Sequence, residues 1–444
     1  MRIPLRTSCL FSLCTCLALQ WQACQKVPES TMCQQQRWFE DADGDGLGNP
    51  QKWQQACEAP PAHVSNALDP NDLNPDPNSQ IATEAAFDGR IDLDHLANYA
   101  SQFIPDYIKW DNGSKNPISD AGATLGRVLF YDKKLSINDQ VACANCHKQA
   151  LAFGDNRQLS LGVNGRTSRH AMRLVNSRFA EETHFFWDER AATLEQLSTL
   201  PIQDPIEMGF SGDNGAPDLD DLIEKLKGVD YYRELFHFVY GDIDINEKRI
   251  QNALSQFIRS IQSFDSPYDE GRRQVADDHQ PFPNFSELEN QGKSLFLTRP
   301  VFGPESIRVG GGAGCQVCHR APEFDIVLNC RNNGVIETAR NPNELELQIT
   351  RSPSLRNLFN PSGQLNGPLM HNGNFTTIEE VIEHYNSIEF DTKRNNNLDT
   401  RLRPMQRGQQ LVLSEQEKEA LSAFLRTLVG TALYEAEKWS DPFL

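Results

Sequence analysis

The sequence contains no long hydrophobic run outside its amino-terminal end, and it has no excess of basic charge. Nothing after the first 24 residues approaches the roughly 18 consecutive apolar residues that a membrane span needs, so we expect the body of the chain to be soluble. Asp and Glu number 61 against 42 Lys and Arg, which gives a formal net charge of −19. Because such a surface repels phosphate backbones, nucleic acid is not an expected partner.

Alternating patterns of the kind that predict strands are also scarce in the 444 residues. Apolar side chains recur instead at spacings of three and four, which is typical of amphipathic helices. The pattern covers residues 218–227, 250–264, 377–385 and 414–429. Ser286, Thr377 and Ser414 are each followed three residues later by Glu, the capping box that opens a helix. The sequence therefore predicts a mostly α fold.

The amino-terminal end has the composition of an export signal. Arg2 and Arg6 precede an apolar run over residues 9–19, a charged region followed by a short hydrophobic one. We interpret residues 1–24 as a signal peptide and expect the mature protein in the periplasm. The residues before Cys24 resemble a bacterial lipobox only loosely, so ordinary cleavage and a lipid anchor at Cys24 both stay open.

Eleven cysteines would suit an exported disulfide scaffold, but their positions indicate another use. Four fall in the signal peptide, and four of the other seven form two C-x-x-C-H frames, Cys143-x-x-Cys146-His147 and Cys315-x-x-Cys318-His319. This frame is the attachment signature of c-type haem. Zinc ribbons place their pairs within about 15–20 residues of each other, and a redox dithiol needs no following His, so both alternatives fit poorly.

The spacing has a chemical reason. Two thiols three positions apart on a helical turn can both reach the vinyl groups of one porphyrin, and the adjacent His then presents its Nε2 to the iron. We therefore expect two covalently bound haems c, attached at Cys143 and Cys146 and at Cys315 and Cys318. His147 and His319 are the expected proximal iron ligands.

An internal repeat predicts two haem domains. Residues 126–130 (GRVLF) lead into the first haem motif and residues 292–296 (GKSLF) into the second. We predict tandem cytochrome c-like domains at residues 83–280 and 281–444, preceded by an acidic, loop-rich segment at residues 25–82.

The acidic segment contains a pattern that suits calcium. Asp41, Asp43 and Asp45 alternate with small residues, and hard cations prefer such a density of carboxylate oxygens on a turning backbone. The pattern resembles the thrombospondin type 3-like calcium loops of secreted bacterial proteins. A solvated acidic linker is the alternative interpretation. Cys33 and Cys57 flank the loop and could form a disulfide.

From about Gly122 to Leu428 the chain resembles the bacterial diheme cytochrome c peroxidases, including the diheme enzyme that matures methylamine dehydrogenase. The matching blocks lie between and after the haem motifs, at residues 174–177 (LVNS), 186–190 (FWDER), 201–208 (PIQDPIEM), 351–357 (RSPSLRN) and 370–373 (MHNG). The resemblance implies reduction of hydrogen peroxide with electrons from a small cytochrome c or copper protein. It also implies that the carboxy-terminal haem receives the electrons and the amino-terminal haem is peroxidatic. It leaves a homodimer open.

Three catalytic residues follow from the resemblance. Glu207 matches the distal acid/base, which agrees with the need for a proton shuttle above an iron that keeps one axial position open. Burial in a haem pocket would raise the pKa of such a carboxyl group toward neutrality. Trp187 matches the tryptophan between the haems, where an indole can relay electrons. Gln196 lies one position before Leu197, which occupies the place of the pocket glutamine.

Two positions depart from the family pattern. Gly162 falls where classical peroxidases carry a His that blocks the peroxidatic iron until reduction, so we predict an iron that is open without reductive activation, unless nearby His170 substitutes. His170 itself stands where the family has the Asn that binds an inter-haem calcium, which puts that calcium in doubt.

The sixth ligand of the second haem is ambiguous. Tyr385 occupies the position at which classical peroxidases have Met and the maturation enzyme has Tyr, and Met370 is the other candidate. A phenolate stabilises oxidised iron, whereas a thioether stabilises the reduced state.

Three functions therefore compete. The leading interpretation is a peroxidase that consumes an external electron donor. The second is a maturation-type oxidase that modifies a partner protein through high-valent haem, which Tyr385 favours. The third is a diheme electron carrier without enzymatic activity.

Overall fold

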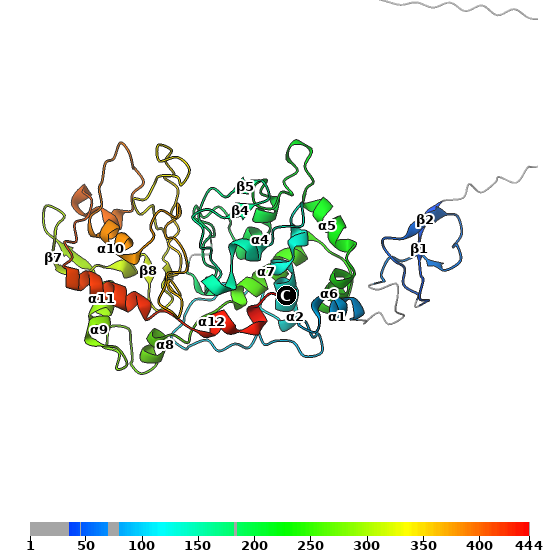
Figure 1. The fold of residues 1–444 in the computed structure, drawn as a ribbon, viewed down its shortest axis with the longest axis horizontal. Coiled ribbons are helices and arrows are strands. Elements are labelled where there is room, and N and C mark those ends of the chain that lie inside the picture. Colours follow the sequence, from blue (N-terminus) through cyan, green and yellow to red (C-terminus); the bar gives the residue numbers. More distant parts are fainter. Residues whose placement is uncertain (1–34, 45, 70–79, 182–183, 444) are drawn as a thin grey trace, which may run out of the picture.

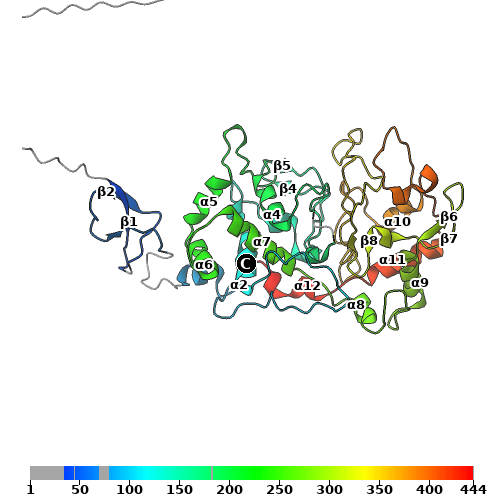
Figure 2. The ribbon, with the colours of Figure 1, turned by 180° about the vertical axis from the view of Figure 1, so that it is seen from behind.

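A computed structural model describes residues 35–44, 46–69, 80–181 and 184–443. They form two mainly helical lobes next to each other, with a small sheet beyond the N-terminal lobe (Figure 1 and Figure 2). The α-helices are α1 (Ile81–Phe87), α2 (Asp120–Tyr131), α3 (Cys143–Cys146), α4 (Leu194–Gln203), α5 (Leu219–Lys227), α6 (Asp230–Tyr240), α7 (Glu247–Ser260), α8 (Pro267–Arg272), α9 (Glu287–Leu297), α10 (Ile378–Asn386), α11 (Glu415–Arg426) and α12 (Ala432–Glu435). Within the described residues no helix is long and apolar enough to span a bilayer.

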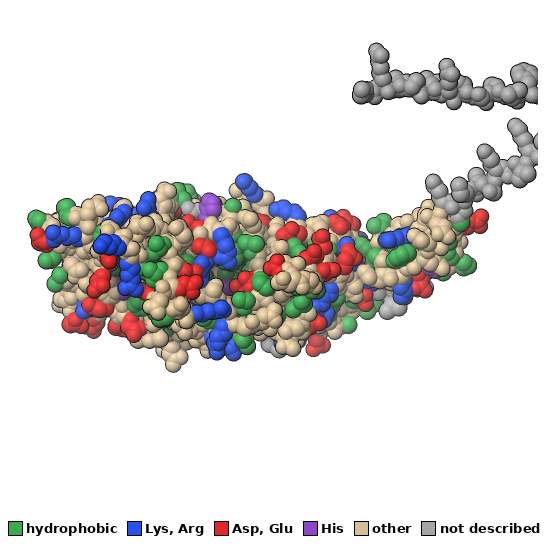
Figure 3. Space-filling view, turned by 90° about the horizontal axis from the view of Figure 1, so that it is seen from above, with side chains coloured by type: hydrophobic (Ala, Val, Ile, Leu, Met, Phe, Trp, Pro, Cys, Tyr) green, Lys and Arg blue, Asp and Glu red, His purple; other side chains and the backbone are tan. Residues whose placement is uncertain are grey.

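The strands are short and pair antiparallel. They are β1 (Gln36–Glu40), β2 (Trp53–Ala56), β3 (His63–Val64), β4 (Leu161–Gly162), β5 (Gly165–Arg166), β6 (Pro300–Phe302), β7 (Arg308–Gly311), β8 (His319–Arg320) and β9 (Asp325–Ile326). Three of them form one sheet in the order β2-β1-β3, and the others form three hairpins. Acidic and basic side chains are interspersed along the surface (Figure 3).

The loop-rich segment predicted at residues 25–82 contains the small β2-β1-β3 sheet, which was not predicted. The alternating pattern did not reveal it because strands of two to five residues are too short to show a period. Cys57 is in a disulfide, as expected. Its expected partner Cys33 lies outside the described residues, as do the whole signal peptide and Cys24.

Both lobes are built around the same helix crossing, which confirms the internal repeat. A Cβ added at Gly126 of α2 would lie 2.0 Å from the carbonyl oxygen of Ala253 on α7. A Cβ added at Gly292 of α9 would lie 1.8 Å from the carbonyl oxygen of Ala420 on α11. Glycine is therefore needed at both crossings for the helix backbones to touch. The three predicted capping boxes are also formed, at the starts of α9, α10 and α11.

The two hydrophobic cores do not divide the chain at the predicted boundary. Tyr268, which precedes residue 281, is buried in the core of the C-terminal lobe together with Phe282. Leu433 and Trp439, near the end of the chain, are buried in the core of the N-terminal lobe. The red segment of Figure 1 accordingly runs from α11 in one lobe to α12 against the other. The chain thus returns to its first lobe after completing the second.

A buried ion pair lies where the lobes meet. Asp269 of α8 and Arg356 are joined by two hydrogen bonds of 2.9 and 3.0 Å, and both side chains are fully buried. The Tyr107 hydroxyl donates a third bond, of 2.8 Å, to Asp269. Tyr107 belongs to the extended segment that precedes α2, so this cluster joins that segment to the C-terminal lobe.

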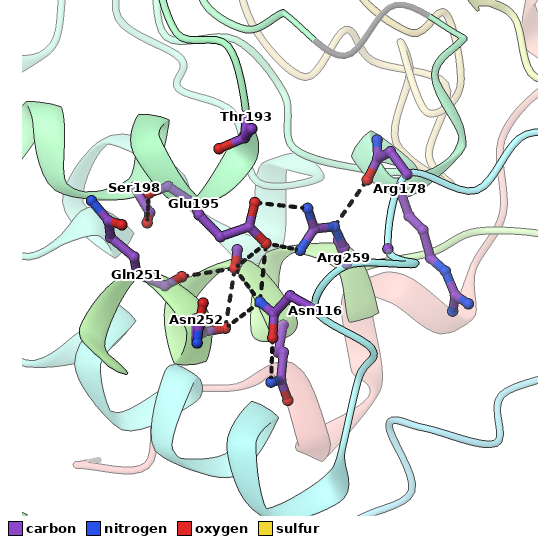
Figure 4. A network of polar contacts seen from close by, with 12 residues as sticks. Asn116, Arg178, Thr193, Glu195, Ser198, Gln251, Asn252 and Arg259 are labelled. Carbon is purple, nitrogen blue, oxygen red and sulfur yellow. Dashed lines mark hydrogen bonds and ion pairs between the residues drawn. The ribbon is translucent and has the colours of Figure 1, made fainter. Parts of the chain in front are cut away.

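A polar network fixes α4, the helix that leads into the Glu207 loop (Figure 4). Glu195 of α4 accepts hydrogen bonds from Arg259 of α7, from Asn116 at 3.0 Å and from Ser255 at 3.1 Å. Burial alone would raise the pKa of Glu195, but the Arg259 guanidinium and the Asn116 amide lower it to about 2. The ionised carboxylate therefore ties α4 to α7.

Candidate functional site: two cysteine pairs and the residues between them

The first cysteine pair lies on the short helix α3. Its two thiols, Cys143 and Cys146, are free, and burial, with smaller contributions from neighbouring charges, raises their pKa values to about 12 and about 11. Nδ1 of His147 lies 3.0 Å from the carbonyl oxygen of Phe153. Since that oxygen can only accept, Nδ1 carries the hydrogen and the Nε2 lone pair is available to a metal.

Glu207 lies near this cysteine pair, close enough for its charge to act on both thiols. Its backbone is held by a turn in which Asp204 Oδ1 accepts from the amides of Ile206 at 2.8 Å and Glu207 at 3.0 Å. Burial and the neighbouring charge of Asp204 raise the pKa of the Glu207 carboxyl to about 7, against a weaker lowering by Arg190. Among the described residues nothing donates a hydrogen bond to this carboxyl group, so it is available to exchange a proton.

The β4–β5 hairpin packs directly on the Glu207 loop. The amide of Val163 donates to the Glu207 carbonyl at 3.0 Å, and that of Asn164 donates to the Ile206 carbonyl at 3.2 Å. A Cβ at Gly162 would lie 2.1 Å from the Ile206 oxygen and 2.7 Å from the Glu207 Cα. No side chain therefore fits at the position where a blocking histidine would stand.

The second pocket is a cavity of about 390 Å³ with a mainly apolar lining. It lies in the size range of small-molecule and cofactor sites. Cys315, Cys318 and His319 line it, and so do Met370 and Tyr385, the two candidate sixth ligands. Burial lowers the pKa of His319 to about 4, so its imidazole is neutral.

The side-chain amide of Asn333 lies within hydrogen-bond distance of both Met370 and Tyr385. Asn333 Nδ2 lies 2.9 Å from the Tyr385 hydroxyl and 3.3 Å from the Met370 sulfur. Burial raises the pKa of Tyr385, and the bond from Asn333 opposes that shift. The structure therefore places both candidates in the same pocket.

Trp187 is buried between the two lobes. Its indole Nε1 donates to the His170 carbonyl at 2.8 Å, and its own carbonyl accepts from the amides of Thr350 at 2.9 Å and Arg351 at 3.1 Å, in the C-terminal lobe. The His371 ring makes an edge contact with the indole at a centroid distance of 6.3 Å. Trp187 also lines the second pocket.

His170 lies in the same region and also lines the second pocket. Its Nδ1 is 3.0 Å from the Arg157 carbonyl and 3.2 Å from that of Gln158. Burial, followed by the charge of Arg173, lowers the pKa of His170 to about 4. Its ring is thus a neutral donor to backbone carbonyls.

A chain of ion pairs connects the surroundings of Glu207 with those of Trp187. Arg190 bonds to Asp188 at 2.9 Å, and Asp188 bonds to Arg169 at 2.7 Å. Arg169 continues to Glu346 at 2.8 Å, and Glu346 lies 3.6 Å from Nε2 of His371, which packs on the indole. The FWDER block, which contains Asp188 and Arg190, is therefore anchored to the C-terminal lobe.

Both cysteine pairs suit covalently attached haem. Each offers two thiols and a neutral imidazole in the order that the attachment needs. The second pocket also has a buried cation: Arg173 lines it, its Nη2 donates to the Ser354 carbonyl at 3.1 Å, and its Nε is buried without a hydrogen-bond partner in the described structure. Burial lowers the pKa of Arg173 to about 10. A buried cation calls for an anion, which a haem propionate would provide.

Gln196 does not line the second pocket. It is exposed on α4, and its Oε1 accepts from the amide of Ala192 at 2.9 Å. A catalytic role for Gln196 stays a prediction.

Only some of the predicted calcium ligands lie within the described residues. Asp41 accepts from the amides of Gly44 at 2.8 Å and Gly46 at 3.2 Å, while Asp45 lies outside. No group of three metal-binding side chains forms in the described part of the chain. Calcium at Asp41, Asp43 and Asp45 stays a prediction.

Sequence reasoning gave no role to three residues at these sites. Arg173 could have been noticed as a charge inside the otherwise apolar MRLV run, and His371 lies in the matching MHNG block. Asn333 carries no spacing signal. The thiol of Cys330 is free and buried, and it accepts from Arg401 Nη1 at 3.3 Å.

The comparisons with known proteins agree with this geometry. The family model for "Di-haem cytochrome c peroxidase" matches residues 120–277. The methylamine utilization protein MauG of Methylophilus methylotrophus is 32% identical over 327 residues, which cover 72% of this chain and 85% of that protein. The chain belongs to the di-haem cytochrome c peroxidase family, which includes MauG-like members.

Other members of the di-haem cytochrome c peroxidase family are similar over the same extent. The cytochrome c551 peroxidase of Nitrosomonas europaea is 26% identical, over 69% of this chain and 80% of that protein. A solved MauG-like protein associated with microbial copper homeostasis is 29% identical, with a TM-score of 0.59 over 77% of this chain and 99% of that one. Membership in the family implies two c-type haems and a peroxide-related oxidoreductase.

Proposed function

We propose that this protein reduces hydrogen peroxide to water with two electrons from a small external donor, a cytochrome c or a copper protein. The electrons are taken up at the His319 pocket and used at the His147 site. One observation carries the proposal: beside the first cysteine pair, a half-buried carboxyl group with a pKa of about 7 lies where Gly162 leaves no room for a blocking side chain.

Glu207 would move the proton that the reaction requires. The overall reaction consumes two protons and two electrons for each peroxide and yields two waters. As a carboxylate, Glu207 would accept the proton of the oxygen that binds first and return it to the oxygen that leaves. Its backbone is held by Asp204 and by the β4–β5 hairpin, so its carboxyl group keeps a fixed position.

Trp187 would carry the electrons between the pockets. It contacts both lobes through its main chain and through its indole. Its N–H donates to a backbone carbonyl, which is no base, so an oxidised indole would keep its proton. Haem bound at each cysteine pair would supply the iron that binds peroxide or exchanges electrons.

The test is steady-state consumption of peroxide by the holoprotein with a reduced small cytochrome. Glu207→Gln should lower kcat/KM by roughly 10²–10⁴-fold, the usual contribution of a proton shuttle. Glu224→Gln is the matched control, because this carboxylate is exposed on α5 and pairs only with Lys227 at the surface. Wild-type protein that consumes no peroxide would instead indicate an electron carrier.

A second candidate function is oxidation of aromatic side chains in a partner protein, the chemistry that the maturation-type oxidases suggest. The position of the Tyr385 hydroxyl in the second pocket favours it, since a phenolate stabilises oxidised iron. Peroxide consumed without a reduced donor, with formation of a covalent change in a partner protein, would identify this activity. Strict dependence on the small cytochrome would exclude it.

A further inference from the structure

Asn333 occupies a position from which one side chain reaches both candidate ligands of the second haem. Its Nδ2 carries two hydrogens, and the Tyr385 hydroxyl at 2.9 Å and the Met370 sulfur at 3.3 Å both lie within reach of them. The three residues come from three separate parts of the C-terminal lobe: the loop after β9, the turn at residues 370–373 and helix α10. All three line the same cavity as His319.

The orientation of the Asn333 amide is fixed. Its Oδ1 accepts from the amide of Val335 at 3.1 Å, so the oxygen is already engaged and Nδ2 must face the cavity. Its backbone carbonyl accepts from Nε2 of His384 at 2.9 Å. Since His384 precedes Tyr385 on α10, Asn333 is attached to the same helix that presents the phenol.

Met370 is also held in place by its backbone. Its φ of +66° lies in the left-handed region, which residues with a side chain seldom adopt. The Met370 carbonyl accepts from the amide of Gly373 at 3.1 Å, and Leu369 pairs with Phe375. The turn therefore keeps the thioether beside Asn333, within the pocket.

The two acceptors gain unequally from the shared donor. An N–H bond to an oxygen strengthens markedly when that oxygen becomes an anion, whereas a thioether is only a weak acceptor. A donor aimed at the phenol thus favours the phenolate as a metal ligand. The bond from the same donor to the Met370 sulfur engages one of its two lone pairs and gains little in return, because a thioether is a weak acceptor.

We propose that Asn333 is a positioning residue that selects Tyr385 over Met370 as the sixth ligand of the second haem, and that loss of its amide donor passes the position to Met370. The inference rests on the proposed function in treating the His319 pocket as the site of electron uptake. There, the choice between phenolate and thioether sets the reduction potential, because a thioether raises it.

The experiment compares oxidised holoproteins without peroxide or donor. Asn333→Asp keeps the size and the acceptor for Val335 but removes the amide donor, and Asn333→Leu removes both. Asn341→Asp is the matched control, because it places the same charge on an exposed position of the same lobe. Mass spectrometry confirms two attached haems in each protein. Because the two Asn333 substitutions differ in kind, a folding defect in one variant still leaves the other to test the inference.

Resonance Raman bands of an iron-bound phenolate should appear in the wild type, in Asn341→Asp and in Met370→Leu. They should be lost in both Asn333 variants, with a gain of the near-infrared band of thioether-ligated ferric haem and an upward shift of the midpoint potential. The double variant Asn333→Leu/Met370→Leu should show neither signature.

Phenolate bands at wild-type intensity in both Asn333 variants, or their absence from the wild type, would overturn the inference. Because the spectra are recorded without peroxide, failure of the proposed peroxidase activity would leave the ligand exchange visible. A loss of activity and a failure of ligand selection are thus separate results.

Discussion

Burial and two neighbours of opposite charge set the acidity of Glu207. Burial and the like charge of Asp204 favour the protonated form, and Arg190 opposes them, so that the pKa rises to about 7. A carboxyl group with that pKa populates both protonation states near neutral pH, which a residue that accepts and returns a proton requires. The same shift also affects folding, because the unfolded glutamate ionises near its ordinary value of 4.5.

We expect kcat/KM for peroxide to rise with pH through about 7, since the carboxylate is the form that accepts the proton. Between pH 4.5 and 7 the folded chain holds a proton that the unfolded chain has lost, so this group's contribution to stability falls as pH rises through that window. Glu207→Gln should remove the rise in kcat/KM. It should also reduce the loss of unfolding free energy across the window by roughly 2–3 kcal/mol.

Both pH series are run on wild type and on the exposed-site variant Glu224→Gln, with chemical denaturation for the stability measurement. An unchanged activity profile in Glu207→Gln would mean that another group takes the proton.

The residues that attach haem covalently could be predicted from the sequence. Cys143, Cys146 and His147 follow from one spacing, and the structure gives His147 the partner that such a ligand needs. Asn333 could not be found in this way, because its role depends on Met370 and Tyr385 folding back onto it. Tertiary contacts of this kind leave no periodic trace in a sequence.

At the scale of elements, the β4–β5 hairpin holds the Glu207 loop in position. Two amides of the hairpin bond to the carbonyls of Ile206 and Glu207, and Gly162 allows the backbones to approach closely. The sequence indicated Gly162 only as a missing histidine. The structure adds a steric reason, because a side chain at this position would overlap the loop that carries the proton shuttle.

Gly162→Ala should therefore damage both stability and catalysis. The added Cβ would meet the backbone of Ile206 and Glu207, and overpacking of this kind costs typically about 1–3 kcal/mol. Because the displaced loop carries Glu207, kcat/KM should fall as well, with its pH dependence shifted or lost. Gly310→Ala on β7 is the matched control, because an added Cβ there would meet nothing within 4 Å. Wild-type kcat/KM in Gly162→Ala would show that the contact does not position Glu207.

The helix crossings show which features a local sequence pattern can predict and which it cannot. The GRVLF and GKSLF repeats predicted equivalent helices, and both glycines lie at equivalent crossings with α7 and α11. The partner at each crossing was not predicted, because α7 and α11 lie more than a hundred residues further along the chain. Contacts between distant segments are set by the whole fold and not by local spacing.

At the scale of the whole molecule, the order of the chain and the order of the lobes differ. After α11 completes the C-terminal lobe, the chain crosses back and buries Leu433 and Trp439 in the N-terminal core. Two hydroxyls of the first lobe donate to this segment at 2.6 Å, Tyr99 to the Lys438 carbonyl and Tyr131 to the Trp439 carbonyl. A division at residue 280 could not foresee this return, since short helices such as α12 have no strong periodicity.

Trp439→Ala should consequently destabilise the N-terminal lobe, although the residue lies at the end of the chain. Trp439 is 3% exposed and its indole donates to Ser260 Oγ at 3.2 Å, so truncation should cost about 3–5 kcal/mol. Calorimetry of the holoprotein, combined with the spectra of the two haems, would report each lobe separately. The His147 haem should lose its native spectrum at a lower temperature than in the wild type, while the His319 haem keeps its own.

Trp110→Ala, at a position 39% exposed, is the control and should shift neither transition by more than a small amount. If the His319 haem were instead the first to respond in Trp439→Ala, the end of the chain would belong energetically to the C-terminal lobe, and the return crossing would have no role in holding the two lobes together.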